Sequence, residues 1–528
     1  MPSRNTSLAW TASLLACLIL AYTPASAQLL GEISFPNSGA EEAQADFLEG
    51  VLYLHNFEYE SAKDAFRRAL EIDSEFAMAY WGEAMTHNHP IWQEQDTAAA
   101  VLVLEEMGDS LAARRAMAGT EREAAWLTTI EVLFGTDPAT EGLDKEERDD
   151  RYRQAMRRLH ETYPEDDEAA AFYSLSILGS AHEGRDFATY MKAAAIADTV
   201  WEDNQKHPGA AHYLIHSYDD PIHAPLGLPM ARVYGKIAPA AAHAQHMTSH
   251  IFVALGLWQD VVDANVVARD VQNAGFAARD RAPRLCGHYP FWLEYGYLQQ
   301  GRVEDARRVL DACRESVTAD VDEGVRWHYG AMRARYLIDA DAWDEIGDLG
   351  IDSEAEVEGF ADYAFADGLA AYYRGDEAGV AAAIEALADP IGYDAAGRAP
   401  LLTLELEGLA LLESDPESAL AKLNEAADSE AGRPFMFGPP SIAKPTFELL
   451  GETLAGMGRH AEAIEAYRTQ LDRTPGRADS YLGLARSASA AEDSETARDA
   501  YARLADLWKH AEPEARGVAE AREQAEKR

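Results

Sequence analysis

Apolar and small residues recur along this chain at the spacing of helical faces, and no segment shows the strict alternation of a half-buried strand. Residues 48–73 (LEGVLYLHNFEYESAKDAFRRALEID) and 447–475 (FELLGETLAGMGRHAEAIEAYRTQLDRTP) place small residues and an aromatic at matching positions. The next unit follows one period later, because the alanines at 463 and 497 and the tyrosines at 467 and 501 are both 34 residues apart. Small residues let two antiparallel helices approach closely, and the aromatic ring fills the gap between neighbouring hairpins. The pattern predicts an all-α solenoid of stacked helix hairpins.

This spacing resembles that of the tetratricopeptide repeat (TPR) family, which implies a right-handed α-solenoid of antiparallel helix hairpins. Residues 108–150 and 314–400 keep helical periodicity but match the repeat poorly, so we expect divergent hairpins there. Residues 433–445, RPFMFGPPSIAKP, hold four prolines and are predicted to be a loop. After the first 27 residues we therefore expect four parts: an N-terminal extension (28–45), a solenoid with divergent repeats (46–432), the loop (433–445), and C-terminal repeats with a capping helix (446–528).

The first 27 residues have the pattern of a secretory signal peptide. Arg4 precedes an apolar run over 8–22, and the small residues ASA at 25–27 form a cleavage pattern before Gln28. We expect a periplasmic or secreted protein; a lipoprotein box ending at Cys17 is the weaker alternative, because the apolar run continues past it. No later segment reaches the about 18 uninterrupted apolar residues of a membrane helix, so we expect no membrane span in the mature chain.

Charge and cysteine content narrow the function further. The 46 basic and 91 acidic residues give a formal net charge of −45, which excludes nucleic acid as a partner. Two cysteines follow the signal segment. Cys286 would begin the first helix of a hairpin and Cys313 would lie near the end of the second, and antiparallel helices bring such ends together. One disulfide and two separate buried thiols both remain open.

Histidines are concentrated in one part of the chain. Seven of the sixteen lie within residues 207–250. Residues three, four or seven apart share a helix face, so this spacing defines two stripes. The stripes are His212 and His216 in HPGAAHYLIHSYDDP, and His243, His246 and His250 in HAQHMTSHIF.

One repeat period separates the two stripes. His212 and His246 are 34 residues apart, as are His216 and His250, and His182 lies another 34 residues before His216. The histidines thus occupy equivalent positions on the first helices of successive repeats. In the TPR family those positions line the concave surface, so the resemblance implies a histidine-rich groove spanning residues 182–250.

The histidine register predicts a metal site. Packed helices lie about 8–10 Å apart, which lets imidazoles from two helices meet one ion, and imidazole ligation with a carboxylate suits zinc, copper or iron. The predicted ligands are His212, His216, His246, His250 and Asp219. We expect His182, Asp220, His223 and His243 to line the groove around them. Catalytic residues stay unassigned; for acid–base work the candidates are Asp220 and Glu183.

Four further histidines are weaker candidates. His87 and His89 precede Pro90 at a predicted helix end, and they would extend the site only if the solenoid curls. His288 and His328 lie among aromatic residues, which is typical of packing or of a groove lining.

HPGAAHYLIHSYDDP, HAQHMTSHIF and FGPPSIAKP together resemble a large group of exported bacterial TPR proteins of unknown biochemical role. The resemblance covers nearly the whole mature chain and implies the fold and the special region, but no activity. Two hypotheses follow. The first is an exported TPR protein whose groove binds a transition metal and which could be a metalloenzyme. The second is a metal-free scaffold whose groove binds a peptide or an envelope protein.

Overall fold

The computed structural model describes residues 29–318, 321–351, 357, 359–392 and 395–526, so the predicted signal segment 1–27 lies outside the described residues. Helices dominate these ranges. The α-helices are α1 (Gln44–His55), α2 (Tyr59–Ile72), α3 (Ala77–Met85), α4 (Thr97–Met107), α5 (Leu111–Ala116), α6 (Glu121–Leu133), α7 (Lys145–Thr162), α8 (Asp167–Gly179), α9 (Phe187–Asp203), α10 (Pro208–Tyr218), α11 (Ala224–Ile237), α12 (Ala242–Ala254), α13 (Trp258–Ala278), α14 (His288–Gln299), α15 (Val303–Glu315), α16 (Glu323–Asp339), α17 (Ala361–Tyr373), α18 (Glu377–Ala386), α19 (Ala395–Leu411), α20 (Pro416–Ala431), α21 (Thr446–Gly456), α22 (His460–Arg473), α23 (Ala478–Ala490), α24 (Ser494–Leu507) and α25 (Val518–Glu526).

The remaining regular structure is short. Two two-residue strands, β1 (Asn88–His89) and β2 (Glu94–Gln95), pair antiparallel. The 3₁₀ turns are η2 (Glu41–Ala43), η3 (Pro90–Trp92), η4 (Pro138–Thr140) and η5 (Trp343–Glu345).

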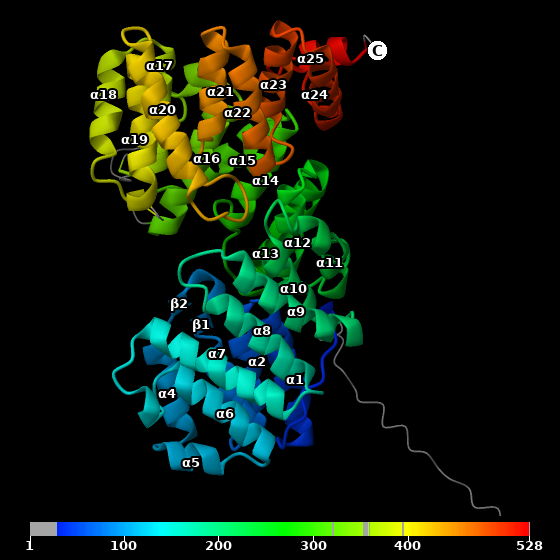
Figure 1. Cartoon of the computed structure of the whole chain (residues 1–528). Coiled ribbons are helices and arrows are strands. Elements are labelled where there is room, and N and C mark those ends of the chain that lie inside the picture. Colours follow the sequence, from blue (N-terminus) through cyan, green and yellow to red (C-terminus); the bar gives the residue numbers. More distant parts are fainter. Residues whose placement is uncertain (1–28, 319–320, 352–356, 358, 393–394, 527–528) are drawn as a thin grey trace, which may run out of the picture.

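Consecutive helices contact each other as pairs, and the pairs stack along the chain (Figure 1). The view places α1–α8 in its lower part, α9–α13 in the middle, and α14–α25 across the top. This arrangement is the all-α, TPR-type solenoid that the repeat spacing predicts. No helix within the described ranges is both long and apolar enough to cross a membrane.

Glycines let the repeats pack around one aromatic ring. A Cβ atom built on Gly50 of α1 would lie 2.6 Å from the Phe66 ring of α2, and one built on Gly82 of α3 would lie 2.3 Å from it. Tyr467 of α22 has the same role, since a Cβ on Gly483 of α23 would lie 2.1 Å from its ring. Such distances exclude any larger residue, because protein cores leave no room for an extra methyl group. The predicted contribution of small residues and an aromatic ring is confirmed at both ends of the chain.

The N-terminal hairpin reaches far along the chain. The turn between α1 and α2, residues 55–58, contacts α10, α11 and α12. The His55 carbonyl oxygen accepts a hydrogen bond of 2.7 Å from His212 Nδ1, across 157 residues of sequence. The Tyr234 hydroxyl donates to Asn56 Oδ1 at 2.8 Å, and the His243 N–H donates to Glu58 Oε1 at 3.0 Å. The first half of the solenoid therefore curls back on itself.

The segment between α20 and α21, residues 432–445, contains no helix or strand. Its Phe437 ring lies 5.3 Å from the His250 ring, centroid to centroid. Gly438 has φ +88, and a Cβ atom there would lie 2.3 Å from Trp292. This proline-rich segment therefore covers α12 and α14 from the side of the C-terminal repeats.

Two further contacts hold the C-terminal half together. Cys286, just before α14, forms a disulfide with Cys313 near the end of α15, as the hairpin placement allowed. Arg477 is fully buried and forms ion pairs of 2.8 Å with Glu448 and 2.7 Å with Asp339. These partners compensate a charge that would otherwise be costly to bury.

Candidate metal centre

Two neighbouring first helices, α10 and α12, present their histidines to each other. Pro208 occupies the first turn of α10, where the missing N–H has no intrahelical acceptor to lose. His207 caps this helix, because its Nδ1 accepts a hydrogen bond of 3.1 Å from the Ala210 N–H. The histidine faces of α10 and α12 are buried: the exposed fraction is at most 7% for His212, His216, His243, His246 and His250.

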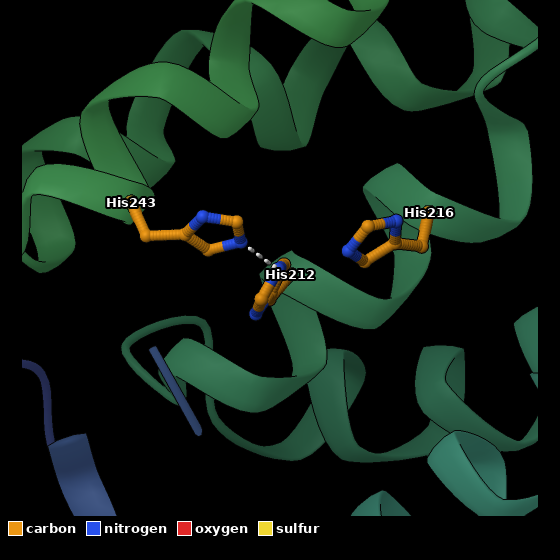
Figure 2. Close-up of side chains that lie close together, drawn as sticks. All are labelled: His212, His216 and His243. Atoms are coloured by element: carbon orange, nitrogen blue, oxygen red, sulfur yellow. Dashed lines mark hydrogen bonds between the residues drawn. The ribbon is translucent and has the colours of Figure 1, made fainter. Parts of the chain in front are cut away.

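The first histidine trio combines both helices. His212 and His216 of α10 meet His243 of α12, and one ligand atom of each lies within 4.8 Å of the others. Figure 2 shows the His243 ring approaching the α10 pair, with its Nε2 at 3.2 Å from His212 Nε2. Three imidazoles at such distances can coordinate one metal ion.

The second histidine trio lies beside the first. His246 and His250 of α12 meet His288, the first residue of α14. The Nε2 atoms of His246 and His250 are 3.1 Å apart, and the His246 and His288 ring centroids are 4.4 Å apart. His288 thus joins a histidine site, whereas its aromatic neighbours suggested a packing or groove-lining residue.

Hydrogen bonds fix the protons of the second trio. His250 Nδ1 lies 2.5 Å from Asp219 Oδ2 and donates to that carboxylate. His246 Nδ1 lies 2.7 Å from Asn265 Oδ1. The Asn265 amide is oriented by its own donation to the Val261 carbonyl, so its oxygen faces His246 and must accept. In the neutral imidazoles both Nδ1 atoms carry the proton, and both Nε2 lone pairs point into the same space.

Similar contacts constrain the first trio. His212 Nδ1 donates to the His55 carbonyl oxygen, which leaves its Nε2 as a lone pair in the neutral ring. His216 Nε2 is buried and has no hydrogen-bond partner. Buried polar atoms normally have partners, so this nitrogen marks a place where a ligand fits.

Burial keeps these imidazoles neutral. It lowers the pKa of His212 to about 3. Burial, reinforced by repulsion between neighbouring histidines, also lowers the pKa values of His216, His243 and His246 well below the ordinary range. Neutral imidazole is the form that binds metal, so these four residues present their lone pairs at neutral pH without losing a proton.

Phe57 forms an apolar wall against the first trio. Its ring centroid lies 4.3 Å from that of His212, 5.5 Å from His243 and 5.9 Å from His216. It also has φ +55, at the end of α1 where glycine is the usual residue. A left-handed conformation costs a residue with a side chain about 1 kcal/mol. This strained conformation occurs at Phe57, the position that places an aromatic ring against the three histidines.

The structure groups the predicted ligands differently from the single four-histidine site that the register suggests. The closest contacts between α10 and α12 join His212 to His243 and Asp219 to His250, and both pairs are 31 residues apart in the sequence. The 34-residue period identifies equivalent positions, but the side chains that meet across the two helices are 31 residues apart, about one helical turn less. His243, expected only in the groove lining, therefore takes the place beside His212 that the register gave to His246.

The other predicted residues lie around the trios. Asp219 is a hydrogen-bond acceptor of His250 and not a member of either trio. Asp220 accepts from His223 Nδ1 at 2.9 Å, outside the trios. His182 lies 3.4 Å from Gln93 and also belongs to neither trio.

The remaining candidates add no ligand to the trios. Glu183 is exposed. His89 stacks on Tyr59 at 4.1 Å, and Tyr59 in turn stacks on Phe57 at 5.4 Å. His328 donates to the Gly324 carbonyl at 2.6 Å.

A third cluster, which the sequence did not reveal, joins α1, α8 and α10. Glu168 lies 2.7 Å from His55 Nε2 and 3.4 Å from His207 Nε2. Burial opposes ionisation of Glu168, but the two histidines outweigh it and lower the pKa of the carboxyl to about 2. His207 accepts at Nδ1, so its proton resides on Nε2 and faces the carboxylate. Glu168 Oε1 and His207 Nε2 are buried without a hydrogen-bond partner, and the three groups also lie close enough together to hold a metal ion.

A small cavity of about 60 Å³ reaches the second trio through Asp219, the hydrogen-bond partner of His250. Asp219 and Asp220 line one side of it, and Phe435, Met436 and Arg473 line the side formed by the proline-rich segment and α22. The carboxylate that orients His250 therefore borders open space.

The tetratricopeptide repeat model matches residues 43–76 and 445–476. The chain carries tetratricopeptide repeats. No curated protein matches it.

Among solved structures, this TPR chain is similar to yeast Tom70, with 15% identity, coverage of 92% of this chain and 95% of that one, and a TM-score of 0.28. It is also similar to the APC/C hetero-tetramer Cut9–Hcn1, with 11% identity, coverage of 93% and 77%, and a TM-score of 0.35. For the human IFIT1 dimer with m7Gppp-AAAA the identity is 12%, the coverage 90% and 94%, and the TM-score 0.34.

Proposed function

We propose that this protein is an exported TPR protein that binds a transition-metal ion, zinc, copper or iron, in its buried histidine cluster. The observation that carries the proposal is the pair of Nε2 atoms of His246 and His250, 3.1 Å apart in the core. Asp219 and Asn265 take both Nδ1 protons, so two lone pairs face each other with no hydrogen between them. A cation between them resolves this repulsion.

The distance suits a metal. Two nitrogens bound to one tetrahedral ion at about 2.0–2.1 Å lie about 3.3 Å apart. His288 supplies the third nitrogen of the trio. Three imidazoles leave one coordination position open, which is the arrangement of catalytic rather than structural zinc sites. The cavity lined by Asp219, the hydrogen-bond partner of His250, gives space for a small molecule on the far side of that carboxylate, which favours a metalloenzyme.

The chain's own residues would orient the ligands. Asp219 and Asn265 hold the His250 and His246 rings with Nε2 directed inward, as the carboxylate and carbonyl partners of metal-bound histidines usually do. Burial excludes water from the rings and keeps His246 neutral. A bound ion would add Lewis acidity at the open position.

The competing occupant of the Nε2 pair is a proton. A doubly protonated His250 could donate from Nδ1 to Asp219 and from Nε2 to His246, and no metal would then be required. The alternative function, a metal-free TPR scaffold that binds a peptide or an envelope protein, corresponds to this case. TPR repeats in general mediate protein–protein interactions, which keeps the alternative open.

Metal analysis separates these cases. Protein purified without chelators, and again after exposure to zinc, copper and iron salts, is analysed for bound metal. We expect tightly bound metal in the unchanged chain and loss of the ion held by the second trio in His246→Ala and His250→Ala. His510→Ala is the matched control, because His510 is exposed and far along the chain. If the unchanged chain binds no metal under any condition, the metal function is wrong and the scaffold is favoured.

Export is a separate part of the proposal. It rests on the signal-like segment 1–27 and has its own test. Mass spectrometry of the mature protein should find Gln28, or its pyroglutamate, at the N-terminus. An acylated Cys17 would instead identify a lipoprotein.

A further inference from the structure

We propose that the first trio, His212, His216 and His243, holds a second metal ion beside the first, so that the protein contains a two-metal centre. The inference rests on the proposed function, since it assumes that imidazoles of this cluster bind metal. Unlike the proposed function, it predicts two bound ions, assigns the second ion to the first trio, and names a class of ligand for the two ions.

The first trio has its own evidence for an ion. His212 Nδ1 is committed to the His55 carbonyl, so its Nε2 lone pair faces His243 Nε2 at 3.2 Å. His216 Nε2, buried beside them, has no hydrogen-bond partner. A proton shared between His212 and His243 would satisfy two of the three nitrogens but not the third. One ion satisfies all three.

The surroundings favour a metal over a water molecule in the first trio. The Phe57 ring contacts all three imidazoles. A bridging water needs two to four polar partners. With its two hydrogens, a water could donate to at most two of the three nitrogen lone pairs. A transition-metal ion needs only the three nitrogen ligands and one further donor.

The two trios are close enough to act as one centre. The His216 and His250 ring centroids are 5.9 Å apart, and those of His243 and His246 are 6.1 Å apart. His243 and His246 are consecutive on one face of α12, so the helix itself fixes the spacing of the two sites.

The charge balance indicates the ligand. The six imidazoles bring no negative charge. Two carboxylates accept hydrogen bonds from the six histidines: Asp219 from His250 Nδ1, and Glu58 from the His243 backbone N–H. The charge of Arg185, which donates to the His216 carbonyl at 3.0 Å, is balanced by Asp220 at 3.6 Å. Two divalent ions would exceed this compensation, so the centre should take a small oxygen-donor anion, such as hydroxide or a carboxylate, between the ions.

The test is a Cu²⁺ titration of the metal-free full chain, read by bound metal and by electron paramagnetic resonance. We expect two equivalents in the unchanged chain, with a signal weakened or broadened by coupling between neighbouring ions. His243→Ala and His216→Gln should each bind one equivalent, with the full, uncoupled signal of an isolated ion. His510→Ala should behave as the unchanged chain. Circular dichroism and thermal unfolding check that each variant is folded, and the two substitutions, on different helices, give two independent chances of a folded protein.

The outcomes separate the two proposals. One equivalent that His243→Ala and His216→Gln leave intact would overturn the second site while the proposed function stands. One equivalent that every trio variant abolishes would also overturn it, in favour of a single ion shared by both trios. No bound metal in the unchanged chain would overturn both proposals.

Discussion

The carboxylate of Asp219 offers a sharp test of how the protein orients its metal ligands. Asp219 and His250 are both nearly inaccessible to solvent, with exposed fractions of 1% and 2%, and their contact is 2.5 Å. The substitution Asp219→Asn keeps the size of the side chain and an oxygen acceptor but removes the charge. Hydrogen bonds to a charged acceptor are about twice as strong as those to a neutral one. His250 should therefore become a weaker ligand without being lost.

The magnitude follows from the behaviour of carboxylates that support metal-bound histidines. Replacing such a partner costs about 10–100-fold in metal affinity, or about 1.4–2.7 kcal/mol. At free metal of about 100 times the original Kd, bound metal stabilises the fold by about 2.7 kcal/mol. The same metal concentration should stabilise Asp219→Asn by only about 0.4–1.4 kcal/mol.

Affinity is measured by competition with a chromophoric chelator, and stabilisation by thermal unfolding with and without metal. The neighbouring change Asp220→Asn is the matched control, since Asp220 binds His223, Arg185 and the backbone and belongs to neither trio. An unchanged affinity in Asp219→Asn, together with loss of binding in His250→Ala, would refute the orienting role. An equal loss in Asp220→Asn would show a general charge effect instead.

Three further predictions concern stability. Burial lowers the pKa of His212 to about 3, from an ordinary value of 6.5, so between these pH values the unfolded chain binds more protons than the folded chain. The unfolding free energy of the metal-free protein should therefore fall as the pH drops from 6.5 towards 3. Urea titration should find a less steep fall in His212→Gln. The disulfide between Cys286 and Cys313 closes a loop of 27 residues, so reduction should cost about 3.5 kcal/mol, and non-reducing peptide maps that find two free thiols would contradict it. Arg477→Ala leaves the buried Asp339 without its ion-pair partner and leaves Glu448 paired with Lys444 alone, so it should cost about 3–5 kcal/mol. The exposed Arg498→Ala should cost less than about 0.5 kcal/mol; equal effects in chemical unfolding would refute the importance of the buried pairs.

The local periodicity of the sequence was enough to predict the fold and the histidines that share one helix face. The 34-residue spacing of Ala463 and Ala497 reports a helix pair that contacts its neighbours in sequence, so a repeat of residue types translates directly into a repeat of contacts. The i, i+4 pair His212 and His216 works in the same way, because a single helix determines that both share one face.

The sequence did not predict which histidines of different helices meet, because this depends on tertiary geometry. The one-turn offset that pairs His212 with His243 depends on how far α10 and α12 slide past each other, and residue spacing does not encode that shift. His288 enters the second trio because α14 begins beside α12. Phe57 reaches the first trio only because the solenoid curls, and its sequence context, LHNFEY, resembles an ordinary repeat turn.

The hydrogen bond between His212 and the His55 carbonyl changes how this repeat protein should unfold. In an open solenoid each repeat touches only its neighbours, so stability adds up along one dimension and the terminal repeats fray first. A contact across 157 residues joins the first hairpin to the middle of the array. The segment from α1 to α12 therefore behaves as a closed loop whose ends protect each other. Hydrogen exchange should find the amides of α1 as slow as those of α10, while α25, which lacks such a bond within the described ranges, exchanges first.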